Sequence, residues 1–128
     1  MRPTGHAMWV VEFYERPNGR CPVQEFRDGL NKKTDLPYID RAFDHLAEYG
    51  HRLPRPYASY LRDDIWELRV KTINGQFRFF YFFFEGEKII ITHGWHKKSK
   101  AKNITDTEIK KAIEYRADYY SRYKGQKR

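Results

Sequence analysis

IWELRVKTINGQFRFFYFFFEGEKIIITHGWHKKSKAK, residues 65–102, is the stretch that decides the fold. Its pattern predicts three consecutive strands joined by two tight turns. Residues 65–71 alternate between apolar and charged side chains, with the period of two that is typical of a half-buried strand. Asn74-Gly75 then favours a hairpin, because both residues tolerate the positive φ that such turns require.

The next two strands are more apolar than the first. Residues 77–84, FRFFYFFF, are almost wholly aromatic, which predicts a central strand covered on both faces. Glu85-Gly86-Glu87 turns the chain again. Residues 89–95 are rich in β-branched side chains and predict the third strand.

Two arginines, Arg69 and Arg78, occur within these predicted strands. A guanidinium group in a half-buried sheet is costly unless it is paired or faces a groove open to solvent. Directly after the third strand comes a histidine followed by four lysines, His96, Lys97, Lys98, Lys100 and Lys102. We therefore expect a concavity that gathers these groups and suits a polyanion, phosphate in particular.

The other segments predict one more strand and three helices. These are a strand at residues 8–14, a helix from Pro22, a helix capped by Asp35 and ended by Gly50, and a last helix that begins at the capping box Thr105-Asp106-Thr107-Glu108. Residues 50–64 are expected to be a connector that packs on the core. The order β-α-α-β-β-β-α predicts an α+β fold, with an antiparallel sheet and its helices on one face.

Size and composition are those of one folded domain spanning residues 1–128. We expect residues 1–7 to be a loose leader and residues 124–128 to be a frayed basic tail. No apolar run approaches the roughly 20 residues of a membrane span. Cys21 is the single cysteine, so no internal disulfide can form, which favours a reducing cytoplasm.

The net charge of +8 is concentrated at one end of the chain. Residues 97–128 hold 11 Lys and Arg against 4 Asp and Glu, whereas residues 1–96 are nearly balanced. A one-sided basic segment on a small domain favours binding of nucleic acid. The alternative is a solubilising tail.

Several motifs, taken in order, resemble the RelE/HigB superfamily of toxins, and in particular its phage-derived HigB-like branch. They are the ELR strand at 67–69, an R-x-x-Y strand at 78–81, an apolar strand that runs into Lys97-Lys98, and a final helix with Glu, Ala and Arg at the expected places. The resemblance covers residues 8–123. It implies the toxin half of a type II toxin–antitoxin pair, with a RelE-like α+β fold related to microbial ribonucleases.

Such toxins cleave mRNA without a metal, often within the ribosome. The resemblance therefore implies three partners: mRNA, the ribosome, and a cognate antitoxin of the helix-turn-helix type encoded next to the toxin. It implies no cofactor and no association with a membrane.

The resemblance also implies roles for residues of the sheet. Arg78 is expected to face the groove and stabilise the phosphate in the transition state. Arg69 is either a second phosphate ligand or the partner of Glu67 in an ion pair. His93 and His96 point to opposite faces of a regular strand, so at most one can line the groove. His96 is the preferred acid or base, with a structural histidine as the alternative.

The lysines supply further contacts with RNA. Lys97 and Lys98 can reach the same phosphate or a neighbouring one, or form a solvated turn. Lys100, Lys102 and Lys111 are expected to bind backbone phosphates. Tyr81 is assigned to the core, with stacking on a base as the alternative.

No metal site is expected, because His93 and His96 lack a third ligand nearby and Cys21 lies at a distant helix start. Two other functions remain open. One is a catalytically weak RelE-like module that binds nucleic acid or protein. The other is a structural or regulatory phage protein whose basic tail binds DNA.

Overall fold

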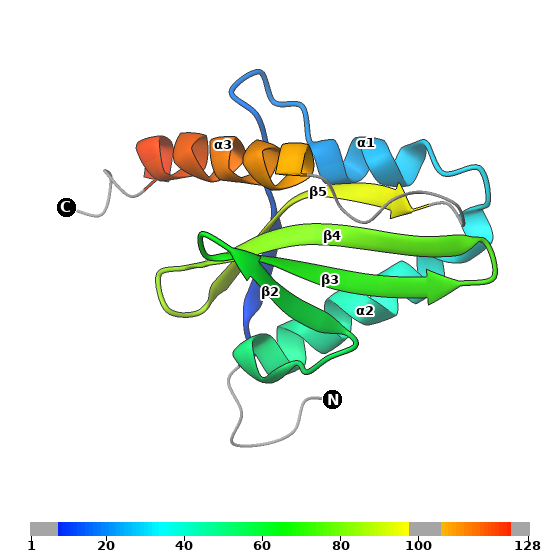
Figure 1. Cartoon of the computed structure of the whole chain (residues 1–128). Helices are drawn as coiled ribbons and strands as arrows, with labels where there is room; N and C mark the ends of the chain where they lie inside the picture. Colours follow the sequence, from blue (N-terminus) through cyan, green and yellow to red (C-terminus); the bar gives the residue numbers. More distant parts are fainter. Residues whose placement is uncertain (1–7, 98–105, 124–128) are drawn as a thin grey trace.

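The structure is a computed structural model, and it describes residues 8–97 and 106–123 (Figure 1). Its elements, in chain order, are β1 (Val10–Phe13), α1 (Pro22–Asp28), the 3₁₀ turn η1 (Lys33–Asp35), α2 (Leu36–Tyr49), the 3₁₀ turn η2 (Gly50–Arg52), β2 (Ala58–Arg62), β3 (Ile65–Thr72), β4 (Gly75–Phe84), β5 (Lys88–Lys97) and α3 (Asp106–Tyr123). No helix in these two ranges is both long enough and apolar enough to cross a membrane.

The five strands form one mixed sheet in the order β1-β5-β4-β3-β2. The β2–β3, β3–β4 and β4–β5 pairs are antiparallel, whereas β1 runs parallel to β5. The prediction of a purely antiparallel sheet was therefore wrong. β1 and β5 are joined through the whole intervening chain, so no tight turn fixes their relative direction.

β2 is a strand that the sequence does not predict, since the pattern of residues 50–64 favours a connector. It forms a hairpin with β3 through Asp63 and Asp64, which both have positive φ values, 52° and 61°. Asn-Gly and Asp-Gly are the strong signals for such a turn, and Asp-Asp is a weaker one.

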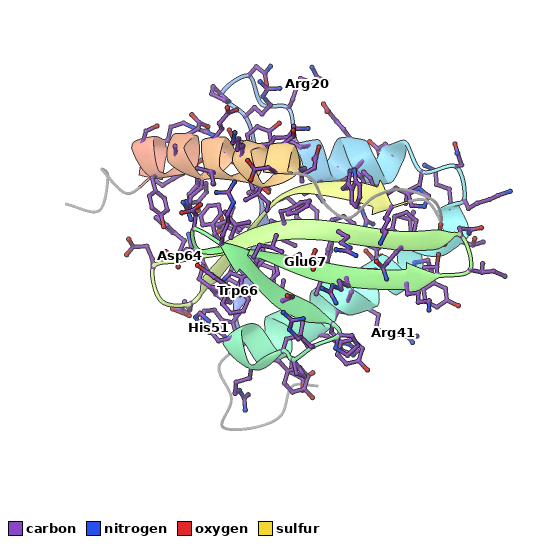
Figure 2. All side chains as sticks on the ribbon, in the orientation of Figure 1. Arg20, Arg41, His51, Asp64, Trp66 and Glu67 are labelled. Carbon is purple, nitrogen blue, oxygen red and sulfur yellow. The ribbon has the colours of Figure 1, made fainter. Side chains whose placement is uncertain are left out.

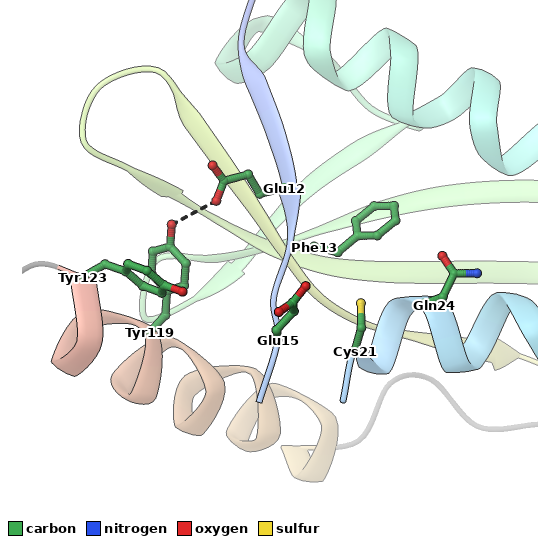
Figure 3. Close-up of a pocket in the computed structure, with 7 residues that line it drawn as sticks. All are labelled: Glu12, Phe13, Glu15, Cys21, Gln24, Tyr119 and Tyr123. Carbon is green, nitrogen blue, oxygen red and sulfur yellow. Dashed lines mark hydrogen bonds between the residues drawn. The ribbon is translucent and has the colours of Figure 1, made fainter. Parts of the chain in front are cut away.

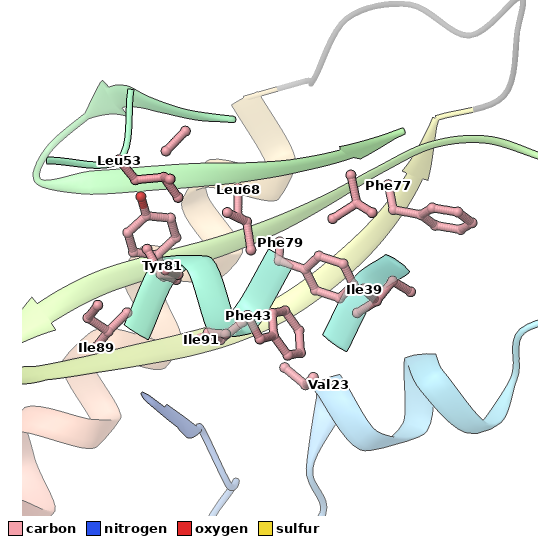
Figure 4. Close-up of a cluster of buried hydrophobic side chains, with 13 residues drawn as sticks. Val23, Ile39, Phe43, Leu53, Leu68, Phe77, Phe79, Tyr81, Ile89 and Ile91 are labelled. Carbon is pink, nitrogen blue, oxygen red and sulfur yellow. The ribbon is translucent and has the colours of Figure 1, made fainter. Parts of the chain in front are cut away.

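The aromatic strand β4 lies at the centre of the sheet, as its composition predicts. Phe77, Phe79 and Tyr81 are buried on one face, and Phe80 and Phe82 are buried on the other. Figure 4 shows the first of these clusters, in which Phe79 packs against Phe43 of α2 with their ring centroids 5.0 Å apart. The prediction of a strand covered on both sides is confirmed.

The helices divide between the two faces, so the prediction that all of them share one face was wrong. Val23 of α1 and Ile39 of α2 belong to the first core cluster. Ala112 and Tyr119 of α3 belong to the second, and Ile109 packs against it. Because β4 is apolar on both sides, each face needs a cover, and α3 supplies the second one.

The predicted cap at Asp35 differs from the structure, whereas the capping residue predicted for α3 lies outside the described residues. Asp35 precedes α2, but its side chain caps no backbone N–H. Its carboxylate is buried and accepts a hydrogen bond from Asn74 Nδ2 at 3.1 Å, which ties η1 to the β3–β4 hairpin. At α3, Thr105 lies outside the described residues, and the Glu108 carboxylate contacts His93 of β5.

Gly50 ends α2 in a conformation that only glycine adopts readily, with φ 53° and ψ −123°. A Cβ atom on Gly50 would lie 2.0 Å from Nε1 of Trp9, whose backbone N–H donates to Ala47 O. The absence of a side chain therefore lets the segment that enters β1 pack closely against the end of α2.

We predict that Gly50→Ala lowers the free energy of unfolding by about 2–5 kcal/mol, because it adds a clash with Trp9 to a strained backbone. Gly19→Ala is the matched control. Gly19 also has a positive φ, 86°, but a Cβ there meets nothing within 4 Å, so backbone strain alone should cost about 1–2 kcal/mol. Equal losses in urea denaturation would show that the Trp9 contact contributes nothing.

Candidate functional site

A hollow of about 410 Å³ opens on the face of the sheet that α3 covers. It is lined by Arg55, Ser59, Tyr60, Leu61, Arg62, Glu67, Arg69, Arg78 and Ile109. We call it the arginine groove. Among the described residues that line it, four are arginines and one is a carboxylate, so its charge strongly favours an anion.

The pairing of the strands assembles the floor of the groove. Arg69 of β3 lies directly opposite Arg78 of β4, and Ser59 of β2 lies opposite Glu67 of β3. Alternate residues of a strand share a face, so Glu67 and Arg69 point the same way. They lie on the face opposite the α2-side core that contains Leu68 and Val70. Figure 2 labels Glu67 on this part of the sheet.

Glu67 holds both sheet arginines. Its Oε1 accepts a hydrogen bond from Arg78 Nη1 at 2.9 Å, and its Oε2 accepts from Arg69 Nε at 2.8 Å. The side chain of Glu67 is 1% exposed. The ion pair of Arg69 with Glu67 that the sequence left open is therefore present. The sharing of the same carboxylate by Arg78 was missed, because strand register cannot be deduced from the residues alone.

Both arginines keep donors for a ligand. Arg78 also donates from Nε and Nη2 to Gln76 Oε1, at 3.3 and 2.8 Å, so these bonds use three of its five N–H groups. The side chain of Arg69 is 28% exposed. The groove can thus offer oriented guanidinium N–H groups to a bound oxyanion, for which arginine forks are well suited.

The start of α3 closes one side of the groove. Arg62 at the end of β2 forms an ion pair with Asp106, the first residue of α3. The hydrogen bond from Arg62 holds the pKa of Asp106 below its ordinary value, and Lys110 adds to this effect. Arg116 of α3 donates to the carbonyl of Asp63 in the β2–β3 turn. These contacts fix Ile109 as a wall of the groove.

His93 lies on the face of Arg78 but does not line the groove. It is 4% exposed, and its Nε2 donates to Glu108 Oε1 at 3.0 Å. Its ring stacks on Phe80 with centroids 4.7 Å apart. Burial lowers the pKa of His93 despite the opposing effect of Glu108, so His93 is held neutral. It joins α3 to β5.

His96, the preferred acid or base, is not brought together with Arg78. It pairs with Phe77 in the β4–β5 ladder and stacks on that ring, with centroids 4.3 Å apart. Its Nε2 donates to the carbonyl of Asn74 at 3.1 Å. Phe77 belongs to the core on the α2 side, so His96 lies on the other face of the sheet.

The structure describes only some of the lysines that the sequence selects. Lys97 ends β5 opposite Gln76, which puts it on the face of Arg78. Lys111 of α3 lies 3.7 Å from Glu108 Oε1. Lys98, Lys100 and Lys102 lie outside the described residues. Tyr81 is buried in the core, as expected, and burial raises its pKa.

Arg55 and Arg62 are the groove residues that sequence reasoning missed. Arg62 is the last residue of β2, and Arg55 lies three residues before that strand begins, so both fall in the stretch predicted to be a connector. Within residues 8–97 and 106–123, no group of three or more His, Cys, Asp or Glu side chains converges as metal ligands do.

A second hollow, of about 540 Å³, has the opposite character (Figure 3). It lies at the β1 edge, between the start of α1 and the end of α3, and is lined by Glu12, Phe13, Glu15, Cys21, Gln24, Tyr119 and Tyr123. Glu12 accepts a hydrogen bond from Tyr119 at 3.1 Å and pairs with Lys88 at 3.2 Å. Its two carboxylates make it unsuited to phosphate, so the arginine groove is the candidate site.

We predict that Glu67→Gln lowers the free energy of unfolding by about 3 kcal/mol, because it leaves two facing guanidinium groups without their shared negative charge. Glu114→Gln, at an exposed position of α3, is the control and should be near neutral. Added phosphate should raise the melting temperature of Glu67→Gln more than that of the parent chain. No rise in either chain would show that the groove does not bind phosphate, and an equal rise would show that Glu67 does not weaken phosphate binding.

The buried His93 should make stability depend on pH. Its pKa is lowered from 6.5 in the folded chain, so the unfolded chain binds the proton more readily and stability is lost as the pH falls below 6.5. Below pH 4.5, protonation of Glu108, whose pKa is lowered by its bond with His93, adds a further loss.

His93→Gln should therefore flatten the decline of melting temperature between neutral pH and pH 5, whereas His45→Gln, at an exposed position of α2, should not. If both variants follow the curve of the parent chain, His93 is not the group that titrates.

Comparison with known families supplies an independent observation. A search of curated proteins finds no match. The family model described as phage-derived protein Gp49-like (DUF891) matches residues 28–116, which is more than half of the chain and includes every residue that lines the arginine groove. The chain therefore belongs to the phage-derived Gp49-like family, a toxin family of the RelE/HigB type found in toxin–antitoxin systems.

Proposed function

We propose that this protein is the toxin component of a type II toxin–antitoxin system, of the HigB branch, and that it is a metal-independent endoribonuclease that cleaves mRNA on the ribosome. The observation that carries the proposal is the arginine groove. In a chain of this toxin family, it holds four arginines around one buried carboxylate and remains open to solvent.

The reaction requires three groups. A base takes the proton of a ribose 2′-OH as that oxygen attacks the adjacent phosphorus, cations stabilise the charge on the phosphate oxygens, and an acid protonates the departing 5′-oxygen. Arg78 and Arg69 bind the phosphate oxygens through the N–H groups that Glu67 leaves available. The products are a 2′,3′-cyclic phosphate and a 5′-hydroxyl.

Glu67 has a positioning role in this scheme. It orients both arginines through hydrogen bonds of 2.8–2.9 Å. Its side chain is 1% exposed and both of its oxygens accept from arginines, so we assign no proton transfer to it. His96 is left out of the scheme because it lies on the other face of the sheet.

The lysines extend the contact along the RNA backbone. Lys97 lies at the end of β5, on the same face of the sheet as Arg78. We propose that Lys98, Lys100, Lys102 and Lys111 bind flanking phosphates. Each neutralised phosphate releases counterions, so binding should weaken steeply as salt rises.

A cognate antitoxin completes the proposal. Membership of a toxin–antitoxin family favours a small neutralising partner, which we propose to be a helix-turn-helix protein encoded beside the toxin gene. Co-expression of the neighbouring gene should relieve growth arrest. The protein that this gene encodes should co-purify with the toxin.

One observation favours a second function, that of a catalytically weak module that binds nucleic acid or protein. Both sheet arginines are already paired with Glu67, which offsets part of their charge. Primer extension on transcripts after brief induction separates the two functions, because only the nuclease produces new 5′ ends. Growth arrest without cleavage would favour the binding module.

We predict that Arg78→Lys lowers the rate of cleavage by about 10²–10³-fold, since lysine keeps the charge but loses the fork that stabilises the transition state. Arg69→Ala should also reduce cleavage. Arg41→Ala, which removes an exposed arginine on α2 labelled in Figure 2, should leave cleavage unchanged. Melting curves confirm that each variant is folded. Full toxicity of Arg78→Lys, Arg69→Ala and Lys97→Ala would refute the site assignment.

A further inference from the structure

Tyr57 lies directly beside the arginine groove. Its carbonyl accepts a hydrogen bond from the backbone N–H of Arg69 at 2.8 Å. This bond continues the β2–β3 ladder, in which Ala58 pairs with Leu68, by one residue. Tyr57 is therefore the cross-strand neighbour of Arg69, a residue that lines the groove.

The alternation of side chains puts Tyr57 on the same face as the groove. Ala58 is buried in the core on the α2 side, whereas Ser59 lines the groove. Tyr57 directly precedes β2, and we extend the alternation of that strand by one residue to assign Tyr57 to the face of Ser59. Tyr57 also lies between Arg55 and Ser59 in the chain, and both of these residues line the groove.

The ring of Tyr57 is available to a ligand. The residue is 55% exposed, and among the described residues its ring and hydroxyl have no hydrogen-bond or aromatic partner. Tyr60 differs, because its hydroxyl accepts from the backbone N–H of Asp64 at 3.1 Å and its ring packs edge-on against Trp66. An exposed aromatic face beside an arginine that binds phosphate matches the arrangement by which proteins hold unpaired nucleotides.

On the basis of the proposed function, we infer that Tyr57 is a base-stacking subsite for single-stranded RNA. Directly opposite residues of an antiparallel pair lie about 5 Å apart, which is within the span of one nucleotide. A nucleotide whose phosphate binds Arg69 and Arg78 lays its base on the ring of Tyr57.

The subsite selects the form of the RNA and not its sequence. Only an unpaired base exposes its face for stacking, and every base has such a face. The groove therefore prefers single-stranded over double-stranded RNA and tolerates different bases beside the bound phosphate. Arg55, which also lines the groove, adds a cation two residues before Tyr57.

The test measures binding of two short fluorescent oligonucleotides by anisotropy at low salt. Both contain 2′-deoxyribose, which lacks the attacking hydroxyl and prevents cleavage; one carries bases and the other is abasic. Tyr57→Ala should weaken binding of the oligonucleotide with bases by about 5- to 150-fold, and Tyr57→Trp should preserve it. Binding of the abasic oligonucleotide should be the same for both variants and for the parent chain.

Tyr38→Ala is the matched control. Tyr38 is 54% exposed but lies on α2, on the other side of the sheet, so its removal should change neither affinity. Melting curves check that each variant is folded. Competition with duplex RNA of the same sequence should be weaker than competition with the single strand.

Three outcomes would overturn the inference. If Tyr57→Ala binds the base-containing oligonucleotide as tightly as the parent chain, while Arg78→Lys weakens both probes, stacking is refuted and the proposed function stands. If Tyr57→Ala weakens the abasic probe equally, Tyr57 acts on the shape of the groove and not on bases. If the parent chain binds neither probe, the proposed function fails together with the subsite.

Discussion

The carboxylate of Glu67, shared by Arg69 and Arg78, is the interaction on which the candidate site is built. The two arginines lie opposite each other on neighbouring strands, where like charges would repel. Glu67 is buried between them and accepts from both, at 2.8 and 2.9 Å. The cost of burying Glu67 and Arg78 is offset only because both are paired and hydrogen-bonded. The same bonds hold both guanidinium groups in the lining of the groove.

The groove also requires that both faces of β4 be covered. α1 and α2 bury Phe77 and Phe79 on one side, so the other side is free to carry Arg78 before it becomes apolar again at Phe80. α3 then closes that second face and contributes Ile109 as a wall. Its position is set by the ion pair of Arg62 with Asp106 and by the bond between His93 and Glu108. The groove therefore depends on the packing of α3 against the sheet.

The two hollows give the molecule an electrostatic asymmetry. The arginine groove lies at the β2 side of the sheet, and the hollow lined by Glu12 and Glu15 lies at the β1 edge. A chain with a net charge of +8 therefore attracts a polyanion to one edge and not to the other. Membership of a toxin family and the arginine groove are the two observations behind the proposed RNA substrate.

Local patterns in the residues were sufficient to predict the three strands from residue 65 onward, the central position of the aromatic strand, the start of α1 at Pro22 and the end of α2 at Gly50. These features depend on neighbours in sequence, since alternation, turn residues and apolar periodicity act over a few residues. Arg69 and Arg78 were identified for the same reason, as charges in an apolar strand.

Three features could not be predicted in this way. β1 runs parallel to β5, α3 covers the second face of the sheet, and Arg69 and Arg78 share the carboxylate of Glu67. Each depends on which strand lies next to which and in what register, and that is settled by packing between segments far apart in the chain. His96 illustrates the difference. Its spacing from His93 correctly predicted opposite faces, but only the pairing of Phe77 with His96 shows that His93, and not His96, shares the face of Arg78.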